Sequence, residues 1–316
     1  MDYIKARSCD YGKDQQRLVD FLLAWRAASE VRLYPTIWRI RLLLSSRVWE
    51  PAKDARLWEN ARGAITGFAM LWRRQPTSPY LVLERFAHPS LATGELQHAM
   101  LAWGDQRGRD ILAEQASPLT EYTSDYTRDT YSAQLLERFG FTRIAPNPDE
   151  HNVYFIRSLQ DEIPPPSLPP GYTIRPLDER DDVKAYQSLY GFTKVNPQHQ
   201  KELLESDEYC HLVVVNPQGD LVAYCECSVC RAEWHQTSQR IGWIEFVETN
   251  PEYKNKGLGL TALLAGLSRL RQWGADTAIL ITMNTNIPAA SLYHKTGFEI
   301  LEIAEYPSYE KKIELL

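Results

Sequence analysis

The sequence has few of the features that mark membrane, secreted and disulfide-rich proteins. Its apolar runs fall well short of the roughly 20 residues that a membrane-spanning helix needs. The first residues have no apolar stretch behind a basic flank, so we expect no secretory leader. Cysteine is rare, and five residues in a chain of 316 do not suit a disulfide framework. With 44% hydrophobic and 24% charged residues, the composition predicts a globular, cytoplasmic protein that does not bind membranes.

An excess of positive charge is also missing. Residues 1–160 carry 21 basic against 19 acidic side chains, and residues 161–316 carry 14 against 22. Neither part offers the basic face that neutralises nucleic-acid phosphates, so we expect no nucleic-acid partner. The acidic second part would attract a cationic substrate such as an amine.

A proline-rich segment divides the chain. Residues 161–171 contain five prolines, which remove amide donors and fix φ, so we expect a semi-rigid linker. It would separate a domain at 1–160 from a domain at 172–316, and each has a normal domain length.

The two parts resemble each other. The motif at 135–141 (Leu-Leu-Glu-Arg-Phe-Gly-Phe) parallels the motif at 292–298 (Leu-Tyr-His-Lys-Thr-Gly-Phe). A strand pattern ending in His88-Pro89 parallels one ending in Asn250-Pro251. The nearly constant offset of about 160 residues indicates duplication of one fold.

The second part alternates strand and helix patterns. Apolar patterning and turn residues predict strands at 172–176, 211–216, 221–229, 241–249, 277–283, 298–303 and 309–313. Helices are predicted up to about residue 204, over 288–295, and from about Leu260 to a stop at Gly274, where leucines follow helical spacing. The order indicates an α/β fold with a mixed sheet flanked by helices.

The stretch 250–259 joins a strand to the leucine-rich helix through small and basic residues. Gly257 and Gly259 let several backbone amides point at one spot, and the helix N-terminus adds partial positive charge. Lys254 and Lys256 add full charges. This pattern predicts a phosphate or pyrophosphate site. The alternative is a helix that merely begins after two flexible glycines, since neither the Walker motif nor a complete dinucleotide fingerprint is present.

A second motif follows about 25 residues later, Asn-x2-Ala-Ala-x-Leu-Tyr-x3-Gly-Phe at 286–298. Together the two motifs resemble the GCN5-related N-acetyltransferase (GNAT) family over 172–316 and, in degraded form, over 3–157. The resemblance implies an acyltransferase (EC 2.3.1.-) that uses acetyl-CoA and no metal. It would act on an amine of a small molecule or peptide, by direct attack in a ternary complex. The alternative is a non-catalytic CoA-binding, CoA-sensing or scaffold protein of the same fold.

The resemblance also implies site residues. The loop amides would hold the pyrophosphate, the strand before the loop would pair with the pantetheine arm, and Lys254 departs from the Gln or Arg of the family signature. The implied cofactor-binding residues are Val247, Glu248, Thr249, Lys254, Asn255, Lys256, Gly257, Leu258, Gly259, Leu260, Asn286 and Tyr293.

Two residues are candidates for proton transfer. Tyr293 matches the tyrosine that protonates the leaving thiolate in many family members, and a phenol that is neutral at pH 7 suits that role. Its alternative role is a buried aromatic. Glu245 is the candidate base, with Glu226 on the preceding strand as a second carboxylate. Strand alternation predicts Glu245 on the face of Trp243 and Val247, and exposed surface carboxylates are the alternative for both glutamates.

The first part of the chain lacks the corresponding loop and tyrosine residues. Its loop keeps Gly94 but has Leu96 in place of the second glycine and no basic residue, and Leu136 stands where Tyr293 stands. We therefore expect a degenerate first domain and an active second one, a layout similar to that of mycothiol synthases. We expect a monomer or homodimer.

The remaining motif is a group of cysteines. Cys225, Cys227 and Cys230, with Cys210 and His211 nearby, invite a metal site, but zinc ligands come as Cys-x2–4-Cys pairs on turns. Two cysteines two apart on a strand favour burial on one core face, and we expect no metal.

Overall fold

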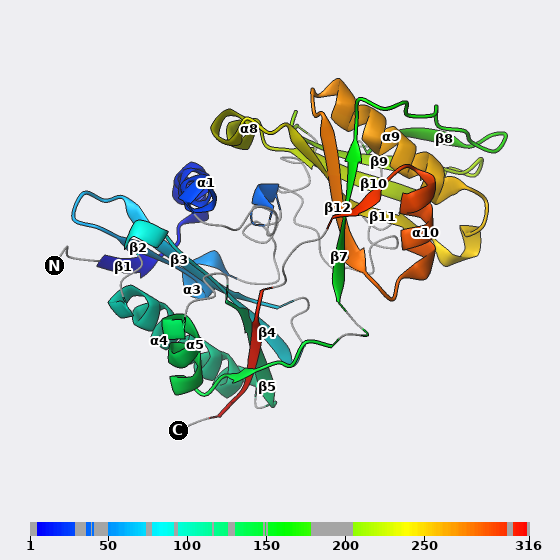
Figure 1. Cartoon of the computed structure of the whole chain (residues 1–316). Helices are drawn as coiled ribbons and strands as arrows, with labels where there is room; N and C mark the ends of the chain where they lie inside the picture. Colours follow the sequence, from blue (N-terminus) through cyan, green and yellow to red (C-terminus); the bar gives the residue numbers. More distant parts are fainter. Residues whose placement is uncertain are drawn as a thin grey trace. The chain divides into compact units, whose positions relative to one another are not determined.

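The computed structural model divides the chain into two units. Unit 1 comprises Met1–Pro146 and Glu305–Leu316, and unit 2 comprises Asn147–Ala304. Each contains one seven-stranded mixed sheet with helices (Figure 1). The structure describes residues 5–28, 36–38, 40, 50–73, 78–91, 94–115, 117–125, 130–147, 149, 151–177, 205–301 and 306–314.

Unit 1 begins with a strand and a long helix. Its strands are β1 (Lys5–Ser8), β2 (Ala55–Glu59), β3 (Ile65–Trp72), β4 (Tyr80–Ala87), β5 (Leu119–Ser124), β6 (Thr142–Arg143) and β14 (Ser308–Ile313). Its helices are α1 (Tyr11–Ala28), α3 (Pro51–Asp54), η1 (Pro89–Leu91), α4 (Gly94–Gln115) and α5 (Thr130–Arg138).

Unit 2 holds most of the predicted elements of the second part. Its strands are β7 (Asn152–Ser158), β8 (Thr173–Pro176), β9 (Tyr209–Val215), β10 (Leu221–Val229), β11 (Ile241–Thr249), β12 (Thr277–Met283) and β13 (Glu299–Leu301). Its helices are α8 (Arg231–Thr237), η2 (Pro251–Tyr253), α9 (Leu258–Gln272) and α10 (Ile287–Lys295). The helices predicted before residue 204 lie outside the described residues, as do residues 302–305.

The two sheets have the same strand order. Sheet one runs β1-β2-β3-β4-β5-β14-β6, and sheet two, taken from its other edge, runs β8-β9-β10-β11-β12-β7-β13. In each sheet the fourth and fifth strands form a parallel pair, β4 with β5 and β11 with β12. The expected mixed α/β fold in tandem copies is confirmed.

The sixth strand of each sheet comes from the other half of the sequence. β7 closes the first half of the chain, yet it lies in the second sheet between β12 and β13. β14 closes the second half and lies in the first sheet between β5 and β6. The expected boundaries, 1–160 and 172–316, therefore differ from the two units, because periodicity identifies a strand without showing which sheet it joins.

The proline-rich segment also differs from its expected role. Residues 161–171 connect β7 to β8 inside unit 2 instead of separating two domains. Ile163 is buried in the unit 2 core and Leu168 packs against it. Thr261 Oγ1 on α9 donates a hydrogen bond to the carbonyl of Ser167 at 2.5 Å. The segment is a packed connection within unit 2 and not a free spacer between two domains.

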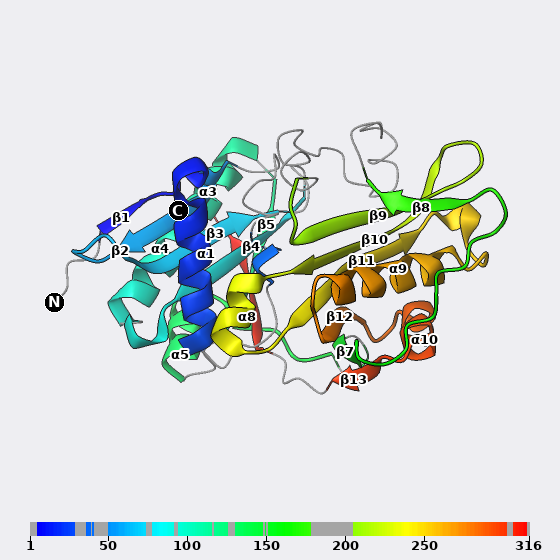
Figure 2. The same cartoon turned by 90° about the horizontal axis from the view of Figure 1, so that it is seen from above.

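Helix α9 covers one face of the second sheet. It lies along β10 and β11 in Figure 2 and contacts β9 as well. Leu263, Leu267 and Leu270 are completely buried there, as their helical spacing predicts. On the strands, Cys225 and Cys227 face the same core.

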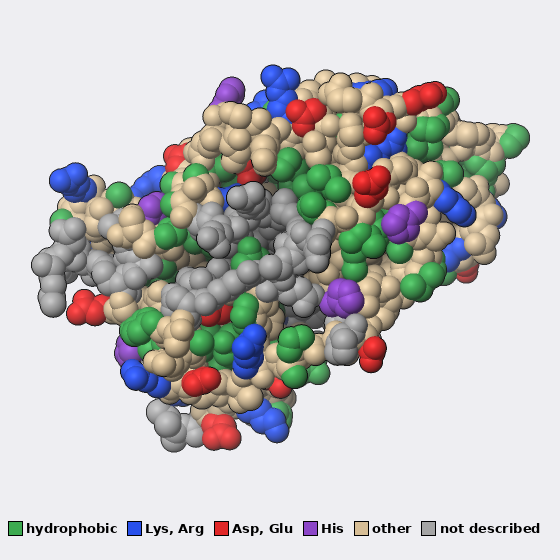
Figure 3. Space-filling view, viewed as in Figure 1, with side chains coloured by type: hydrophobic (Ala, Val, Ile, Leu, Met, Phe, Trp, Pro, Cys, Tyr) green, Lys and Arg blue, Asp and Glu red, His purple; other side chains and the backbone are tan. Residues whose placement is uncertain are grey.

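Among the described residues, no helix is long and apolar enough to cross a membrane. On the face of the molecule drawn in Figure 3, basic and acidic side chains are interspersed over the described surface.

Candidate functional site

The site begins where two parallel strands part. β11 and β12 pair over only three positions, from Ile241 opposite Thr277 to Trp243 opposite Ile279. β11 continues to Thr249, paired on its other edge with β10 along its length. Its edge toward β12 therefore carries backbone groups beyond Trp243 that β12 does not engage. The predicted strand residues Val247, Glu248 and Thr249 lie in this part of β11.

A β-bulge interrupts β11 at Glu245. Phe246 lies opposite Glu226 and Ile244 lies opposite Cys227, so Glu245 is the extra residue. Ile244 and Val247 consequently both face the core under α9. The carboxylate of Glu245 instead accepts a hydrogen bond from Ser228 Oγ at 2.7 Å, on the opposite face of β10. The predicted grouping of Glu245 with Val247 was wrong, because the bulge breaks the alternation on which it relied.

The second candidate carboxylate, Glu226, contacts side chains of the neighbouring strand. Glu226 is buried, and Tyr209 Oη donates a hydrogen bond to its Oε2 at 2.5 Å. His211 Nδ1 lies 3.8 Å from its other oxygen. Glu226 is thus a poorer candidate than the half-buried Glu245 for receiving a proton from a substrate.

The loop after β11 has a backbone shaped by two left-handed residues. Asn255 has φ 63° and Gly257 has φ 77°. Lys254, Asn255, Lys256 and Gly257 are exposed. When right-handed and left-handed backbone conformations follow each other in a turn, successive amide N–H groups point toward the same side. Such a group of amides favours the binding of an anion.

The start of α9 leaves its first amides available. Gly257 is the N-cap residue and supplies no side-chain acceptor, and the first backbone bond of the helix runs from Thr261 N to Gly257 O. The amides of Leu258, Gly259 and Leu260 precede that bond, so they have no acceptor within the helix. Unpaired amides and the helix dipole favour a bound phosphate group.

Gly259 brings the helix against the end of β11. A Cβ at this position would lie 3.0 Å from Thr249 Oγ1, whereas a Cβ on Gly257 would meet nothing within 4 Å. The amides of the first turn therefore begin directly beside the free edge of β11. The residues expected to bind a CoA diphosphate and pantetheine arm are brought together.

A contact that the sequence did not predict holds the loop. Asn216 Nδ2, in the turn between β9 and β10, donates to Tyr253 Oη at 3.0 Å. Lys256 Nζ lies 4.6 Å from the centre of the Tyr253 ring, within cation–π range. Tyr253 fixes the loop through Asn216, which is 37 residues away in the sequence. The sequence alone does not show that these two residues are paired.

Helix α10 carries the remaining predicted residues. Asn286 is its N-cap and accepts a hydrogen bond from Ala289 N at 3.4 Å. Tyr293 is 7% exposed, with Phe155 and Phe298 packed edge-on at ring distances of 5.4 and 6.0 Å. Burial, with a smaller effect of Cys225, raises the pKa of Tyr293 to about 12. The phenol is therefore neutral at physiological pH.

The same position in unit 1 carries no acid group. Phe298 N bonds to the carbonyl of Tyr293, and Phe141 N bonds to the carbonyl of Leu136 in the same way. Leu136 is completely buried on α5. The structure thus places Leu136 at the site equivalent to Tyr293, as the duplicated motif predicts.

The start of α4 in unit 1 also differs from that of α9. The hydroxyl of Tyr131 lies against Gly94, where a Cβ would collide with it. No such side chain lies over Gly257 among the described residues. A tyrosine thus stands at the first turn of α4, where unit 2 has open space.

The five cysteines are buried, and none forms a disulfide. Within the described part of the chain, no group of three or more His, Cys, Asp or Glu side chains is placed to hold a metal ion.

Comparisons with known proteins give the same assignment. Residues 173–298 match the Acetyltransferase (GNAT) family. The chain is 29% identical to a mycothiol acetyltransferase of Saccharomonospora viridis over 54% of this chain and 58% of that protein. It is 26% identical to a mycothiol acetyltransferase of Pseudarthrobacter chlorophenolicus over 81% of this chain and 77% of that one.

A solved structure shares the whole fold. The tandem GNAT protein from the clavulanic acid biosynthesis pathway has a TM-score of 0.66 at 14% identity, over 99% of this chain and 100% of that one. The family resemblance drawn from the two motifs is confirmed. Residues 173–298 thus form a domain of the GNAT family of acetyltransferases, and unit 1 repeats the strand order of its sheet.

Proposed function

We propose that unit 2 transfers an acetyl group from acetyl-CoA to an amine of a small molecule or peptide. The observation that carries this proposal is the uncapped start of α9 beside the free edge of β11. We place the reaction in the cytoplasm, in a monomer or homodimer that requires neither nucleic acid nor membrane, as the sequence leads us to expect.

The loop and the strand would bind the donor. Amides from Gly257 to Leu260 would hold the pyrophosphate, with the exposed Lys254 and Lys256 adding charge and Asn255 shaping the turn. The free edge of β11 from Val247 to Thr249 would pair with the amides of the pantetheine arm. Asn286 would support this site by fixing the start of α10 beside the end of β12.

Direct attack of the amine needs a proton acceptor and a group that stabilises the leaving thiolate. Glu245 would accept the proton, held in place by the Ser228 hydroxyl. The Tyr293 hydroxyl would donate a hydrogen bond to the thiolate as the carbon–sulfur bond breaks. With a pKa of about 12, above the ~8.5 of an ordinary thiol, the phenol favours a hydrogen bond over complete release of its proton.

The acceptor belongs to the class of amines. The relatives are named mycothiol acetyltransferases, which supports a small-molecule acceptor more than a large protein. Unit 1 would not catalyse, because it has Leu136 in place of Tyr293 and Tyr131 over the start of α4.

An acetyl-transfer screen tests the proposal. The purified chain is incubated with acetyl-CoA and a library of small-molecule and peptide amines, and the release of free CoA is measured together with the mass of each acceptor. We expect at least one amine to gain an acetyl group, and we expect Glu245→Gln to slow that transfer without loss of CoA binding. A chain that binds CoA and acetylates no amine would contradict the proposal and favour a sensing or scaffold role.

A further inference from the structure

Two cysteines that the acyl-transfer site does not use lie opposite each other in unit 2. Cys210 on β9 and Cys227 on β10 are direct partners in the antiparallel ladder. Both belong to the core cluster beneath α9, where Cys227 is fully buried and Cys210 is 9% exposed. Two thiols on one face of adjacent strands are within reach of each other.

The ladder fixes the spacing of their backbones. The bond from Val229 N to Glu208 O at 2.8 Å makes that opposed pair a hydrogen-bonded one. Bonded and non-bonded pairs alternate, so Cys210 and Cys227 are again a hydrogen-bonded pair, with Cα atoms about 5.5 Å apart. Disulfides join cysteines whose Cα atoms are about 4.4–6.8 Å apart. A bond between the two sulfur atoms therefore needs no large backbone movement.

The two thiols differ in reactivity. A hydrogen bond from Cys227 lowers the pKa of Cys210, and the positive charge of Arg269 acts in the same direction. Burial raises the pKa of Cys227. Cys210 is thus the better nucleophile, since the thiolate is the reactive form, and Cys227 is the thiol beside it.

We propose that Cys210 and Cys227 form a reversible redox pair, in which hydrogen peroxide converts the two thiols to a disulfide between β9 and β10. The Cys210 thiolate attacks one peroxide oxygen, which gives a sulfenic acid and releases hydroxide. The Cys227 sulfur then attacks the Cys210 sulfur and displaces the sulfenic oxygen, which leaves as water with the thiol proton. Two thiols lose two electrons, one peroxide gains them, and two waters form after protonation. A dithiol reductant reverses the reaction.

Cys225 provides a matched control within the same strand. It lies two residues before Cys227, faces the same core and is fully buried. Its partner on β9 is Leu212 instead of a cysteine, and burial raises the pKa of its thiol. If burial alone controlled oxidation, Cys225 and Cys227 would be oxidised to the same extent. The proposed pair predicts that Cys227 forms the disulfide and Cys225 does not.

Peptide mapping of the intact full-length chain tests the proposal. The folded protein is treated with increasing hydrogen peroxide, unfolded in the presence of an alkylating agent, digested without reductant and analysed by mass spectrometry. Met283, at 39% exposure, reports the peroxide dose by its conversion to the sulfoxide. We expect a disulfide between the peptides of Cys210 and Cys227 to appear before Met283 is half oxidised. Dithiothreitol should remove this disulfide, and Cys225 should be recovered in alkylated form.

Two variants sharpen the test. Cys225→Ser should keep the disulfide, and Cys227→Ser should leave a sulfenic acid on Cys210 that dimedone traps. Recovery of both wild-type thiols in alkylated form after Met283 is oxidised would overturn the proposal. Irreversible oxidation of Cys210, or a disulfide to Cys225 or Cys230, would overturn it as well. The wild-type map needs no variant to fold and is independent of whether the chain transfers acyl groups.

Discussion

Gly257 and Gly259 occupy the same loop for different physical reasons. Gly257 has a left-handed backbone with φ 77° and open space around it, whereas the space at Gly259 is limited by Thr249 on β11. A side chain at Gly257 therefore strains the backbone, and a side chain at Gly259 pushes α9 away from the strand. Both effects would disturb the amides of the first turn.

Gly257→Val should weaken CoA binding by at least tenfold, because a β-branched residue resists the left-handed conformation that directs the amides. Gly63→Val is the matched control, since Gly63 has φ 75° and open space but lies in a turn of unit 1. Calorimetric titration of both folded variants measures the effect. Equal CoA affinity in the two variants would show that the loop does not bind the diphosphate.

Tyr293→Phe should lower kcat by about 10²-fold or more, the usual effect of losing a general acid or a single donor to developing charge. The substitution keeps the ring that packs between Phe155 and Phe298, so CoA affinity should change little. Because burial raises the pKa of Tyr293 to about 12, ionisation of this phenol should cause no loss of rate up to about pH 10.

Steady-state kinetics from pH 6 to 10 check this prediction, with a working acceptor from the amine screen. A Phe variant with nearly full kcat would make Tyr293 a packing residue. A wild-type rate that falls near pH 10 while the Phe variant's does not would contradict the raised pKa.

At the scale of elements, local pattern predicted most strands and helices of the second half. β10, β11 and β12 have the expected bounds, and α9 begins at Leu258, two residues before the predicted Leu260. The alternation of β11 failed at Glu245, because a bulge depends on the register with β10 and leaves no mark on one strand alone. The loop was predicted from its glycines and lysines, but its anchor through Asn216 and Tyr253 required the fold.

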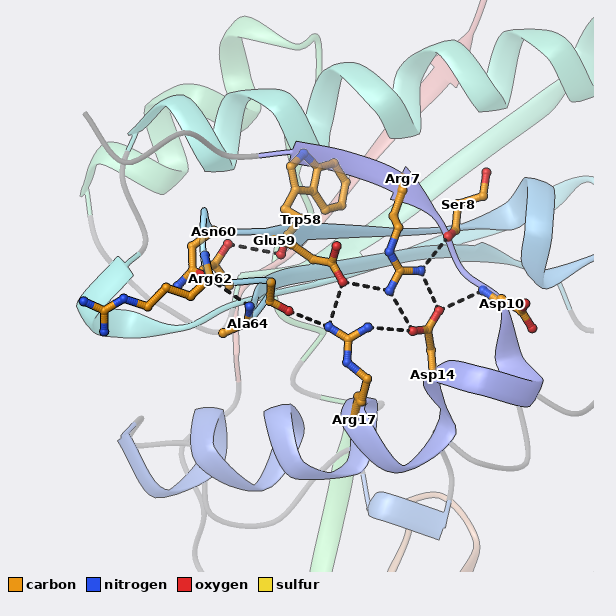
Figure 4. Close-up of polar contacts among 12 residues, drawn as sticks. Arg7, Ser8, Asp10, Asp14, Arg17, Trp58, Glu59, Asn60, Arg62 and Ala64 are labelled. Carbon is orange, nitrogen blue, oxygen red and sulfur yellow. Dashed lines mark hydrogen bonds and ion pairs between the residues drawn. The ribbon is translucent and has the colours of Figure 1, made fainter.

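An ion network ties the first elements of unit 1 together. Arg7 on β1 and Arg17 on α1 both contact Asp14 of α1 and Glu59 of β2 (Figure 4). Arg17 also donates to the carbonyl of Gly63 in the turn before β3. Hydrogen bonds from Arg7 hold the pKa values of Asp14 and Glu59 below their usual ranges.

Asp14→Asn should reduce the free energy of unfolding at pH 7. It should also make that free energy fall less steeply as the pH is lowered. A carboxylate with a lowered folded-state pKa stabilises the fold above its unfolded pKa of about 4 and loses that contribution as pH falls through the folded value. Urea unfolding between about pH 3 and pH 7 measures the slope. Asp20→Asn, an exposed change on the same helix, should leave the slope unchanged, and equal slopes in all three proteins would contradict the role of Asp14.

At the scale of the whole molecule, duplication is combined with a reciprocal exchange of strands. β7 and β14 take equivalent places in the two sheets, each supplied by the other half of the sequence. Lys311 on β14 brings a charge into unit 1, where its Nζ lies 2.5 Å from Asp105 and 3.4 Å from the fully buried Glu121. Removal of one member from a buried ion group is costly, by about 3–5 kcal/mol. Sequence pattern predicted β14 at 309–313 without its partner strands, and it did not single out β7.

The exchange predicts which fragments fold. A fragment of residues 147–304 contains all seven strands of the second sheet, and we expect it to fold and bind CoA. A fragment of residues 172–316 lacks β7, which pairs with β12 along its whole length, and carries β14 without its partner. We expect that fragment to be unfolded. Circular dichroism melting and CoA titration of both fragments measure this, and a folded, CoA-binding 172–316 would contradict the exchange.

The number of CoA molecules bound per chain tests the central claim most directly. Unit 2 has the free edge of β11 and the uncapped start of α9, whereas Tyr131 stands over the start of α4 in unit 1. Calorimetric titration of the full chain with acetyl-CoA should therefore give one site, and Gly257→Val should weaken that site. Two sites per chain, or one site unaffected by Gly257→Val, would contradict an acyl-CoA site confined to unit 2.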